Sequence, residues 1–140
     1  MQLNISTDYA IRTVIYLSGK DDIANADEIS EVVGVSKDYL TKILRNLTKA
    51  NIVGVQRGVK GGYFLKKDPK DISLYDVIIL MEKTININSC LDDEKNCNLS
   101  RTDFCQVRKF YISLQEDIDA KMKALSFAEL LEETEKASDK

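Results

Sequence analysis

The sequence predicts a mainly α-helical protein with one small β-hairpin, and three observations lead to this prediction. Apolar residues recur at helical spacing along most of the chain, and polar residues that favour helix caps precede several of these stretches. A glycine-rich stretch, 58–62, separates two short runs of β-branched and aromatic residues. The 140 residues, 44% hydrophobic and 31% charged, suit one globular domain with an appended element.

The first helix is expected from Ser6 to Leu17. Ser6 can cap it, Asp8 lies where the positive end of the helix dipole favours an anion, and Gly19 ends it. One face of this helix carries the apolar stripe Ala10, Val14 and Leu17.

Two further helices follow with a tight connection between them. Asn25 and Glu28 have capping-box spacing before a helix over 26–33, and Gly34 ends it. Ser36 then caps a helix to about Ala50, with an apolar stripe made by Leu40, Ile43, Leu44 and Leu47. Its opposite face carries Lys37, Thr41, Lys42, Arg45, Thr48 and Lys49. Two helices joined by a short turn, the second with a basic outer face, match a helix-turn-helix.

The next segment is expected to form a β-hairpin with strands near 52–57 and 63–66. We interpret it as a wing, at about 53–66, because glycines at its tip let the backbone approach a phosphate or a narrow groove and Arg57 and Lys60 supply charge. The alternative is an ordinary hairpin with a flexible turn. The preceding helix-turn-helix favours the wing.

Charge is distributed unevenly along the chain. Residues 36–67 hold eight basic residues and one acidic residue, so this segment carries +7 while the remaining residues carry −10. A polyanion responds to such a local patch rather than to the total of −3, although a solvated charged face is the plainer alternative. The residues expected to contact double-stranded DNA are Ser36, Lys37, Tyr39, Thr41, Lys42, Arg45, Arg57, Gly58, Lys60 and Gly61.

The second half of the chain is expected to hold three more helices and one polar segment. Ser73 and Asp76 form a capping box before a helix to about Lys83, and a polar segment over 84–101 follows. A long helix begins near Thr102, with an apolar stripe of Val107, Tyr111, Leu114, Ile118, Met122 and Leu125. Ser126 and Glu129 then cap a short final helix through Phe127, Leu130 and Leu131, and the polar tail from Glu132 is expected to fray.

The long amphipathic helix has too little core to cover it within so small a chain. We expect a second copy to cover it, which also suits DNA reading because a two-fold dimer matches a near-palindromic operator. The competing arrangement is a bundle with the first and fourth helices of the same chain. The expected division is a winged helix-turn-helix over 1–83, a cysteine-containing loop over 84–101, and a dimerisation helix with a short C-terminal helix over 102–136.

Several protein classes are excluded by composition. The absence of His excludes a His general base, a Ser-His-Asp triad and His-ligated zinc, and no nucleophile-base pair is evident, so an enzyme is not expected. No apolar run is long enough to span a bilayer and no secretory leader is recognisable, so a cytoplasmic protein is expected.

The three cysteines follow a Cys-x6-Cys-x7-Cys pattern at Cys90, Cys97 and Cys105, among mostly polar neighbours. Exposed thiols of this kind are open to oxidation unless something engages them. An iron-sulfur cluster, a zinc ion, a redox disulfide with one thiol left over, or no ligand at all are the alternatives. With no His, a fourth ligand would be a carboxylate, an amide, a small molecule or water.

Four motifs together resemble the Rrf-two (BadM-type) bacterial transcription regulators over most of the chain, from about Met1 to Leu131. They are Thr7-Asp8-Tyr9-Ala10-Ile11-Arg12, Ser36-Lys37-Asp38-Tyr39-Leu40 with Leu44 and Leu47, the wing Arg57-Gly58-Val59-Lys60-Gly61-Gly62-Tyr63-Phe64-Leu65, and the late three-cysteine segment. The resemblance implies a winged helix-turn-helix with a long crossing dimerisation helix. In cluster-binding members, three cysteines hold a 2Fe-2S or 4Fe-4S centre whose state sets DNA affinity.

The resemblance also bears on the fourth ligand. The iron-sulfur biogenesis regulators of the family carry a His three residues after the third Cys, where this chain has Arg108. The nitric-oxide-sensing repressors use an Asp of the first helix from the other protomer, and the matching residue here is Asp8, although a first-turn acid is equally expected from the helix dipole alone. Other members sense cysteine metabolism or oxidants without a cluster.

The sequence therefore predicts a homodimeric DNA-binding regulator, most simply a repressor, controlled by an iron-sulfur cluster that senses nitric oxide, redox state or iron-sulfur status. The expected cluster ligands are Cys90, Cys97 and Cys105, with Asp8 from the partner chain. The alternative is a regulator of the same fold with a thiol-disulfide or zinc switch.

Overall fold

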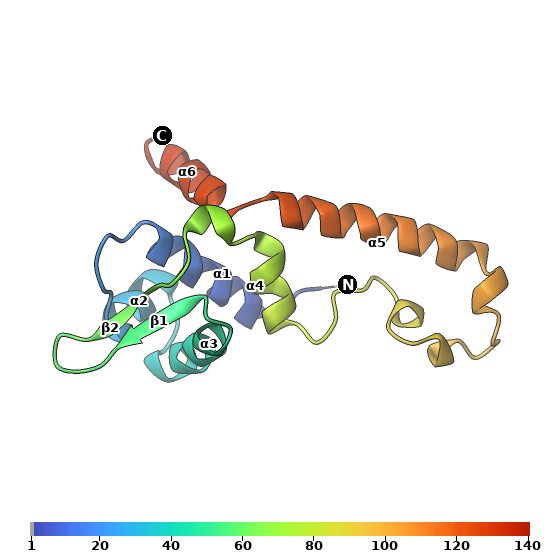
Figure 1. Cartoon of the computed structure of the whole chain (residues 1–140), viewed down its shortest axis with the longest axis horizontal. Helices are drawn as coiled ribbons and strands as arrows, with labels where there is room; N and C mark the ends of the chain where they lie inside the picture. Colours follow the sequence, from blue (N-terminus) through green and yellow to red (C-terminus); the bar gives the residue numbers. More distant parts are fainter. Residues whose placement is uncertain (1) are drawn as a thin grey trace.

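The computed structural model describes residues 2–140, and it contains a winged domain from which one long helix extends (Figure 1). The helices are α1 (Ile5–Ser18), α2 (Ala26–Val33), α3 (Lys37–Lys49), α4 (Leu74–Met81), α5 (Gln106–Ala124) and α6 (Phe127–Ser138). The strands are β1 (Val53–Gln56) and β2 (Gly62–Leu65). Short 3-10 turns lie at Pro69–Asp71, Ser89–Leu91, Glu94–Asn96 and Thr102–Phe104. The mainly helical fold with one hairpin is confirmed.

The core of the winged domain lies between α1, α2, α3, β1 and α4. Helix α3 contributes four buried apolar side chains with the spacing expected from the sequence: Leu40, Ile43, Leu44 and Leu47. Phe127, the first residue of α6, is fully buried in the same core. Because α6 is anchored in this way, the end of the chain packs on the domain that its beginning builds.

Local caps set most of the helix boundaries. Asn25 and Ser36 accept hydrogen bonds from the backbone N–H groups of Glu28 and Tyr39, so α2 and α3 begin where they were predicted. Gly34 ends α2 with φ of 78°, a left-handed conformation that suits glycine. The capping boxes that begin α4 at Ser73 and α6 at Ser126 are both present.

Three predicted boundaries are wrong. Helix α1 begins at Ile5 with Asn4 at the cap position, so Ser6 lies inside the helix rather than capping it. Helix α5 begins at Gln106 rather than Thr102, because the intervening residues form a 3-10 turn and the Cys105 thiol accepts a hydrogen bond from an amide of the first turn. Helix α6 continues to Ser138 instead of fraying from Glu132.

The hairpin pairs β1 and β2 antiparallel, with Val53 opposite Leu65 and Gln56 opposite Gly62. Near its turn the hairpin is tied to the connection before α2, because Ala24 and Tyr63, which lies opposite Val55, exchange backbone hydrogen bonds of 3.0 and 2.8 Å. The tip projects from the domain at the end of β1 and β2 that lies away from α3 (Figure 1). The strands are therefore held in place close to the turn, while residues 57–60 of the tip are exposed.

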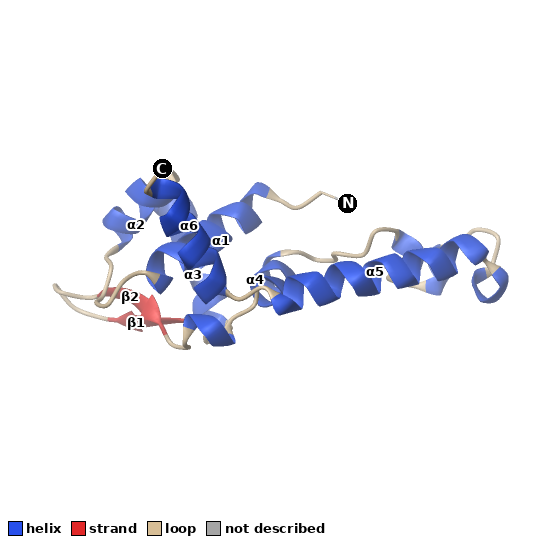
Figure 2. Cartoon of the chain, turned by 90° about the horizontal axis from the view of Figure 1, so that it is seen from above, coloured by secondary structure: helices blue, strands red, loops and turns tan. Residues whose placement is uncertain are grey.

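Helix α5 extends away from the winged domain, with the cysteine segment running back along it (Figure 2). The C-terminal end of α5 is attached where Leu74 donates to the Leu125 carbonyl at 2.8 Å and Phe127 donates to the Ile72 carbonyl at 2.9 Å. Gln115 is the only buried residue of α5, and α5 packs on α4 but not closely on α1, so the expected alternative of a bundle with both helices does not form. None of the helices within residues 2–140 is long and apolar enough to cross a membrane.

Candidate functional site

The exposed face of α3 presents the basic residues that the sequence singled out. Lys37, Lys42 and Arg45 are exposed, together with Ser36 and Thr41, while Tyr39 is half-buried. Within residues 2–140, Lys42 and Arg45 make no salt bridge, so their charges are available to an anion. Lys37 differs, because its ammonium lies 3.0 Å from the Asp27 carboxylate of α2.

The hydroxyl group of Thr41 has already used its single hydrogen-bond donor. Its hydroxyl donates to the Lys37 carbonyl at 2.8 Å, one helical turn earlier. The hydroxyl oxygen can therefore still accept a hydrogen bond, and the methyl group offers an apolar contact. Such a side chain suits a base-edge donor or a thymine methyl rather than a base acceptor.

The hairpin tip adds a second basic element whose backbone only glycine can form. Gly58 has φ of 112°, and a Cβ at Gly61 would come within 2.1 Å of the Gln56 carbonyl oxygen. Arg57 and Lys60 flank these glycines and are exposed. The tight turn therefore brings two cations and bare backbone to one protruding edge, as a wing requires.

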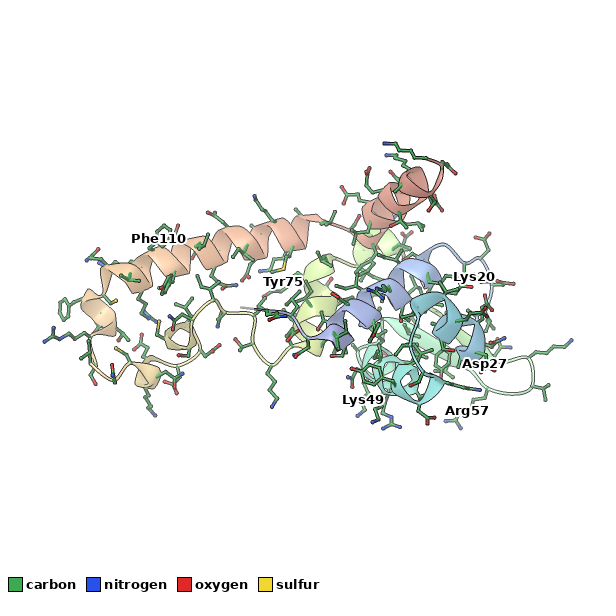
Figure 3. The ribbon with its side chains drawn as sticks, turned by 180° about the vertical axis from the view of Figure 1, so that it is seen from behind. Lys20, Asp27, Lys49, Arg57, Tyr75 and Phe110 are labelled. Carbon is green, nitrogen blue, oxygen red and sulfur yellow. The ribbon has the colours of Figure 1, made fainter. Side chains whose placement is uncertain are left out.

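A shallow hollow of about 250 Å³ joins the exposed basic face of α3 to the hairpin. Lys49 and Arg57 lie along the same edge of the domain (Figure 3). The sequence-based site did not include Thr48, Lys49, Val55 or Tyr63. Lys49 shares the basic face of α3, which could have suggested it, but only the docked hairpin brings Val55 and Tyr63 beside that face. The residues that line the hollow are Thr41, Arg45, Thr48, Lys49, Val55 and Tyr63.

The cysteine segment, 84–105, lies along α5 and outside the winged domain (Figure 1). Cys90, Cys97 and Cys105 are free thiols, and each is half-buried. Hydrogen bonds from the backbone amides of Arg101 and Leu99 hold the pKa of the Cys97 thiol below its ordinary value. The Cys105 thiol accepts from the Arg108 amide at 3.4 Å. At Cys97 the amide donors favour the thiolate, the form that binds metals.

Arg108 makes hydrogen bonds to both Cys90 and Cys105, the latter through its backbone amide. Its Nε donates to the Cys90 carbonyl at 3.3 Å, and its Nη2 lies 3.1 Å from the Glu94 carboxylate. Further along α5, the buried Gln115 accepts from the Ile87 amide at 2.9 Å. The segment is thus fastened to α5 at two places about two helical turns apart.

The three thiols supply the donors that an iron-sulfur cluster needs, but one chain does not bring them together. No group of three or more His, Cys, Asp or Glu side chains in residues 2–140 is arranged to hold a metal ion. Asp8 is exposed in the first turn of α1, in the winged domain, while the cysteine segment lies along α5. The donor chemistry of the three thiols therefore fits a cluster, although in this structure their side chains are not arranged around a metal ion.

Comparison with known proteins identifies the family of this chain. The family model described as "Iron-dependent Transcriptional regulator", Rrf2, matches residues 3–133. The chain belongs to the Rrf2 family of transcriptional regulators.

Two curated relatives and two solved structures illustrate the similarity. The HTH-type transcriptional regulator NsrR of Bacillus subtilis is 35% identical over 98 residues, which cover 69% of this chain and 67% of NsrR. The NsrR of Bacillus licheniformis is 36% identical over 103 residues, or 71% and 72% of the two chains.

Among solved structures, IscR of T. potens gives a TM-score of 0.77 at 22% identity, covering 98% of this chain and 90% of IscR. CymR, the global cysteine regulator of B. subtilis, gives 0.75 at 21% identity, covering 94% and 97%. At these identities the two structures establish the fold, a winged helix-turn-helix with a long helix. The expected family and fold are therefore confirmed.

Proposed function

We propose that this Rrf2-family chain is a homodimeric, sequence-specific DNA-binding repressor whose DNA affinity is set by an iron-sulfur cluster on its cysteine segment. The observation that carries the DNA-binding part is that the basic face of α3 and the basic hairpin tip are both exposed, and that a hollow joins α3 to the hairpin strands. Lys42 and Arg45 of α3, and Arg57 and Lys60 of the tip, have no salt-bridge partner among residues 2–140.

These two basic elements suit two grooves of DNA. An α-helix fits the major groove, where Arg and Lys pair with guanine and Thr contacts thymine, so α3 would present Ser36, Lys37, Tyr39, Thr41, Lys42 and Arg45 there. The hairpin tip, with Arg57, Gly58, Lys60 and Gly61, would meet the backbone or the minor groove. Lys49 is added to this set because it lines the hollow between α3 and the hairpin strands.

The exposed face of α5 supports a dimer. Val107, Phe110 and Leu114 are 55%, 64% and 38% exposed in the single chain. Apolar side chains at this spacing on a helix of 19 residues, about 28 Å long, are typical of a face that packs on another helix. A second copy would cover the face and set two α3 helices against one near-palindromic operator.

Cys90, Cys97 and Cys105 would hold the cluster, with Asp8 of the partner chain as the proposed fourth ligand. A bound cluster would supply a centre that nitric oxide, oxidants or loss of iron can alter. The residues of this chain that would respond are those that fasten the segment to α5, since Arg108 holds Cys90 and Gln115 holds Ile87. The description of the family as iron-dependent supports this assignment.

Two measurements test the proposal separately. Selection of duplex DNA from a random library by the native protein should enrich a near-palindromic sequence, and no enrichment would contradict DNA binding. Protein purified without oxygen should contain iron and sulfide, and Cys97→Ser should lose both. Protein with no iron or sulfide after reconstitution would remove the cluster and leave the DNA-binding proposal standing.

The second candidate is a regulator of the same fold with a thiol-disulfide or zinc switch. The disulfide form is favoured by the lowered pKa of the Cys97 thiol, because the thiolate is the form that attacks another sulfur, and zinc is a second use of the same three free thiols. Thiol counting before and after mild oxidation, together with zinc analysis, separates it from the first candidate. Loss of two thiols without iron would identify the disulfide switch.

A further inference from the structure

The N-terminus of α1 is capped by a carboxylate from a distant part of the chain. Asn4 occupies the cap position, but its side chain makes no cap hydrogen bond to the helix. Instead, Glu82 accepts hydrogen bonds from the Asn4 amide at 2.7 Å, from Asn4 Nδ2 at 2.8 Å and from the Thr7 hydroxyl at 2.5 Å. Thr7 is completely buried, so this carboxylate satisfies a hydroxyl that water does not reach.

Glu82 stands at a junction in the chain. It directly follows α4 and its own amide donates to the Ile78 carbonyl at 2.9 Å, which fixes its backbone to the end of that helix. Two residues later the cysteine segment begins, with Thr84 and Asn86 both bound to the Asp92 carboxylate. A change of shape in the cysteine segment therefore acts on the chain next to Glu82.

The first turns of α1 contact both helices of the helix-turn-helix, α2 and α3. The Tyr9 ring meets the Tyr39 ring of α3 edge to face, with centroids 5.7 Å apart. The Arg12 guanidinium lies 5.4 Å from the Tyr9 centroid and donates to the Val33 carbonyl, at the end of α2, at 3.4 Å. The position of the α1 N-terminus thus bears directly on the start of α3.

We propose that Glu82 is a positioning residue that couples the cysteine segment to the DNA-binding face through α1. The carboxylate holds the N-terminus of α1 through charge-assisted hydrogen bonds and lies at the positive end of the helix dipole. When it is held, Tyr9 supports Tyr39 and α3 keeps its orientation. When the cysteine segment moves Glu82, α1 loses its cap and α3 loses that support. This role rests on the proposed DNA-binding function.

Binding of the library-selected duplex, measured by fluorescence anisotropy, tests the role with matched variants. Glu82→Ala should weaken binding about tenfold, the size expected for the loss of charge-assisted hydrogen bonds. Glu82→Gln keeps one of the two accepting oxygens but loses the charge, so its loss of affinity should lie between those of the native protein and Glu82→Ala. Glu116→Ala removes an exposed acid of α5 and should bind as the native protein does. Unchanged binding by Glu82→Ala, or an equal loss in Glu116→Ala, overturns the proposal.

Hydrogen exchange of the DNA-free protein supplies the second arm. Glu82→Ala should speed exchange in residues 5–9 and 37–41 while leaving the interior of α4 protected, whereas a purely structural loss would speed exchange throughout. If Glu82→Ala fails to fold, Asn4→Ala serves instead, because it removes one donor at an exposed position and should show the same pattern more weakly. Unchanged exchange in residues 37–41 overturns the coupling. A native protein that enriches no duplex contradicts the DNA-binding function, and the exchange pattern then decides the coupling alone.

Discussion

Lys42 and Arg45 extend from the exposed face of α3 with no acidic partner in the described part of the chain. Reversing one of these charges replaces an attraction to phosphate or guanine with a repulsion. We expect Lys42→Glu and Arg45→Glu each to weaken binding to the selected duplex at least about tenfold, and to lower its salt dependence. Fluorescence anisotropy at several salt concentrations measures both effects.

The control is Lys136→Glu, which changes the total charge equally but lies on α6, outside the proposed interface. Its DNA affinity should stay within about twofold of the native value. Equal losses in Lys42→Glu and Lys136→Glu would show that total charge, rather than the α3 face, determines binding.

Phe127 is the one fully buried residue of α6, and Leu130 packs beside it against the core of the winged domain. The Phe127 amide donates to the Ile72 carbonyl at 2.9 Å. Phe127→Ala should lower the free energy of unfolding by about 3–5 kcal/mol, because a large buried ring leaves a cavity. Urea denaturation measures this change, and Val59→Ala, at the exposed hairpin tip, should leave stability within about 0.5 kcal/mol of native.

Helices α1 and α2 are joined by a polar cluster at their neighbouring ends. Glu28 of α2 accepts hydrogen bonds from Lys20, at 2.8 Å, and from the Tyr16 hydroxyl. Both bonds, the Lys20 one first, hold the pKa of Glu28 below its ordinary value. A carboxyl whose pKa is lower in the folded state than in the unfolded state stabilises the fold at neutral pH. That contribution is lost as the pH falls through the folded-state pKa.

Glu28→Gln should therefore be less stable than the native protein at pH 7, and the difference should shrink below about pH 4.3, the ordinary pKa of Glu. Urea denaturation at pH 7, 5 and 3 measures this convergence. Glu31→Gln, an exposed position of the same helix, should show no such pH-dependent difference. A constant difference for Glu28→Gln at every pH would contradict the assignment.

Elements with local signals were predictable from the sequence, and elements with distant partners were not. Asn25, Ser36 and Ser126 cap the residues three positions ahead, so the starts of α2, α3 and α6 could be read directly. The start of α1 could not, because its carboxylate cap, Glu82, is 78 positions away. Nor could the start of α5, since a thiol at the cap position is not a recognised sequence signal.

The same distinction applies to the site. The basic face of α3 follows from helical periodicity, so Lys42 and Arg45 were predictable. The hollow between α3 and β1 depends on how the hairpin docks, which placed Val55 and Tyr63 beyond sequence reasoning. The hydrogen bond from Arg108 to the Cys90 carbonyl joins residues 18 positions apart. It could not be predicted, because the segment between them is irregular and has no repeating spacing that indicates its contacts.

At the scale of the whole molecule, the arrangement of α5 separates two functions. Its C-terminal end is attached to the winged domain near Ile72 and Leu74, and its N-terminal half carries the cysteine segment on one side. Phe110 points from the opposite side of α5 (Figure 3). One face of the helix thus holds the proposed sensor, and another is left for a second copy.

Phe110 offers the most direct test of that second copy. The sequence-based stripe on α5 omitted it and included Tyr111 and Ile118, which are half-buried in the single chain. Phe110→Glu places a charge at the centre of the exposed face formed with Val107 and Leu114. A charge in a helix-helix contact is desolvated without a partner, so the variant should sediment as a monomer where the native protein sediments as a dimer.

The loss of the dimer should also weaken DNA binding by about a hundredfold or more, because each monomer would then bind through a single half-site. Lys109→Glu adds an acidic group one residue earlier, about 100° around the helix, and should leave both sedimentation and DNA affinity near native values. Sedimentation velocity and anisotropy on the same samples measure the two effects together. A Phe110→Glu variant that stays dimeric would place the subunit contact elsewhere, whereas a monomer with native affinity would show that a single winged domain suffices to read the operator.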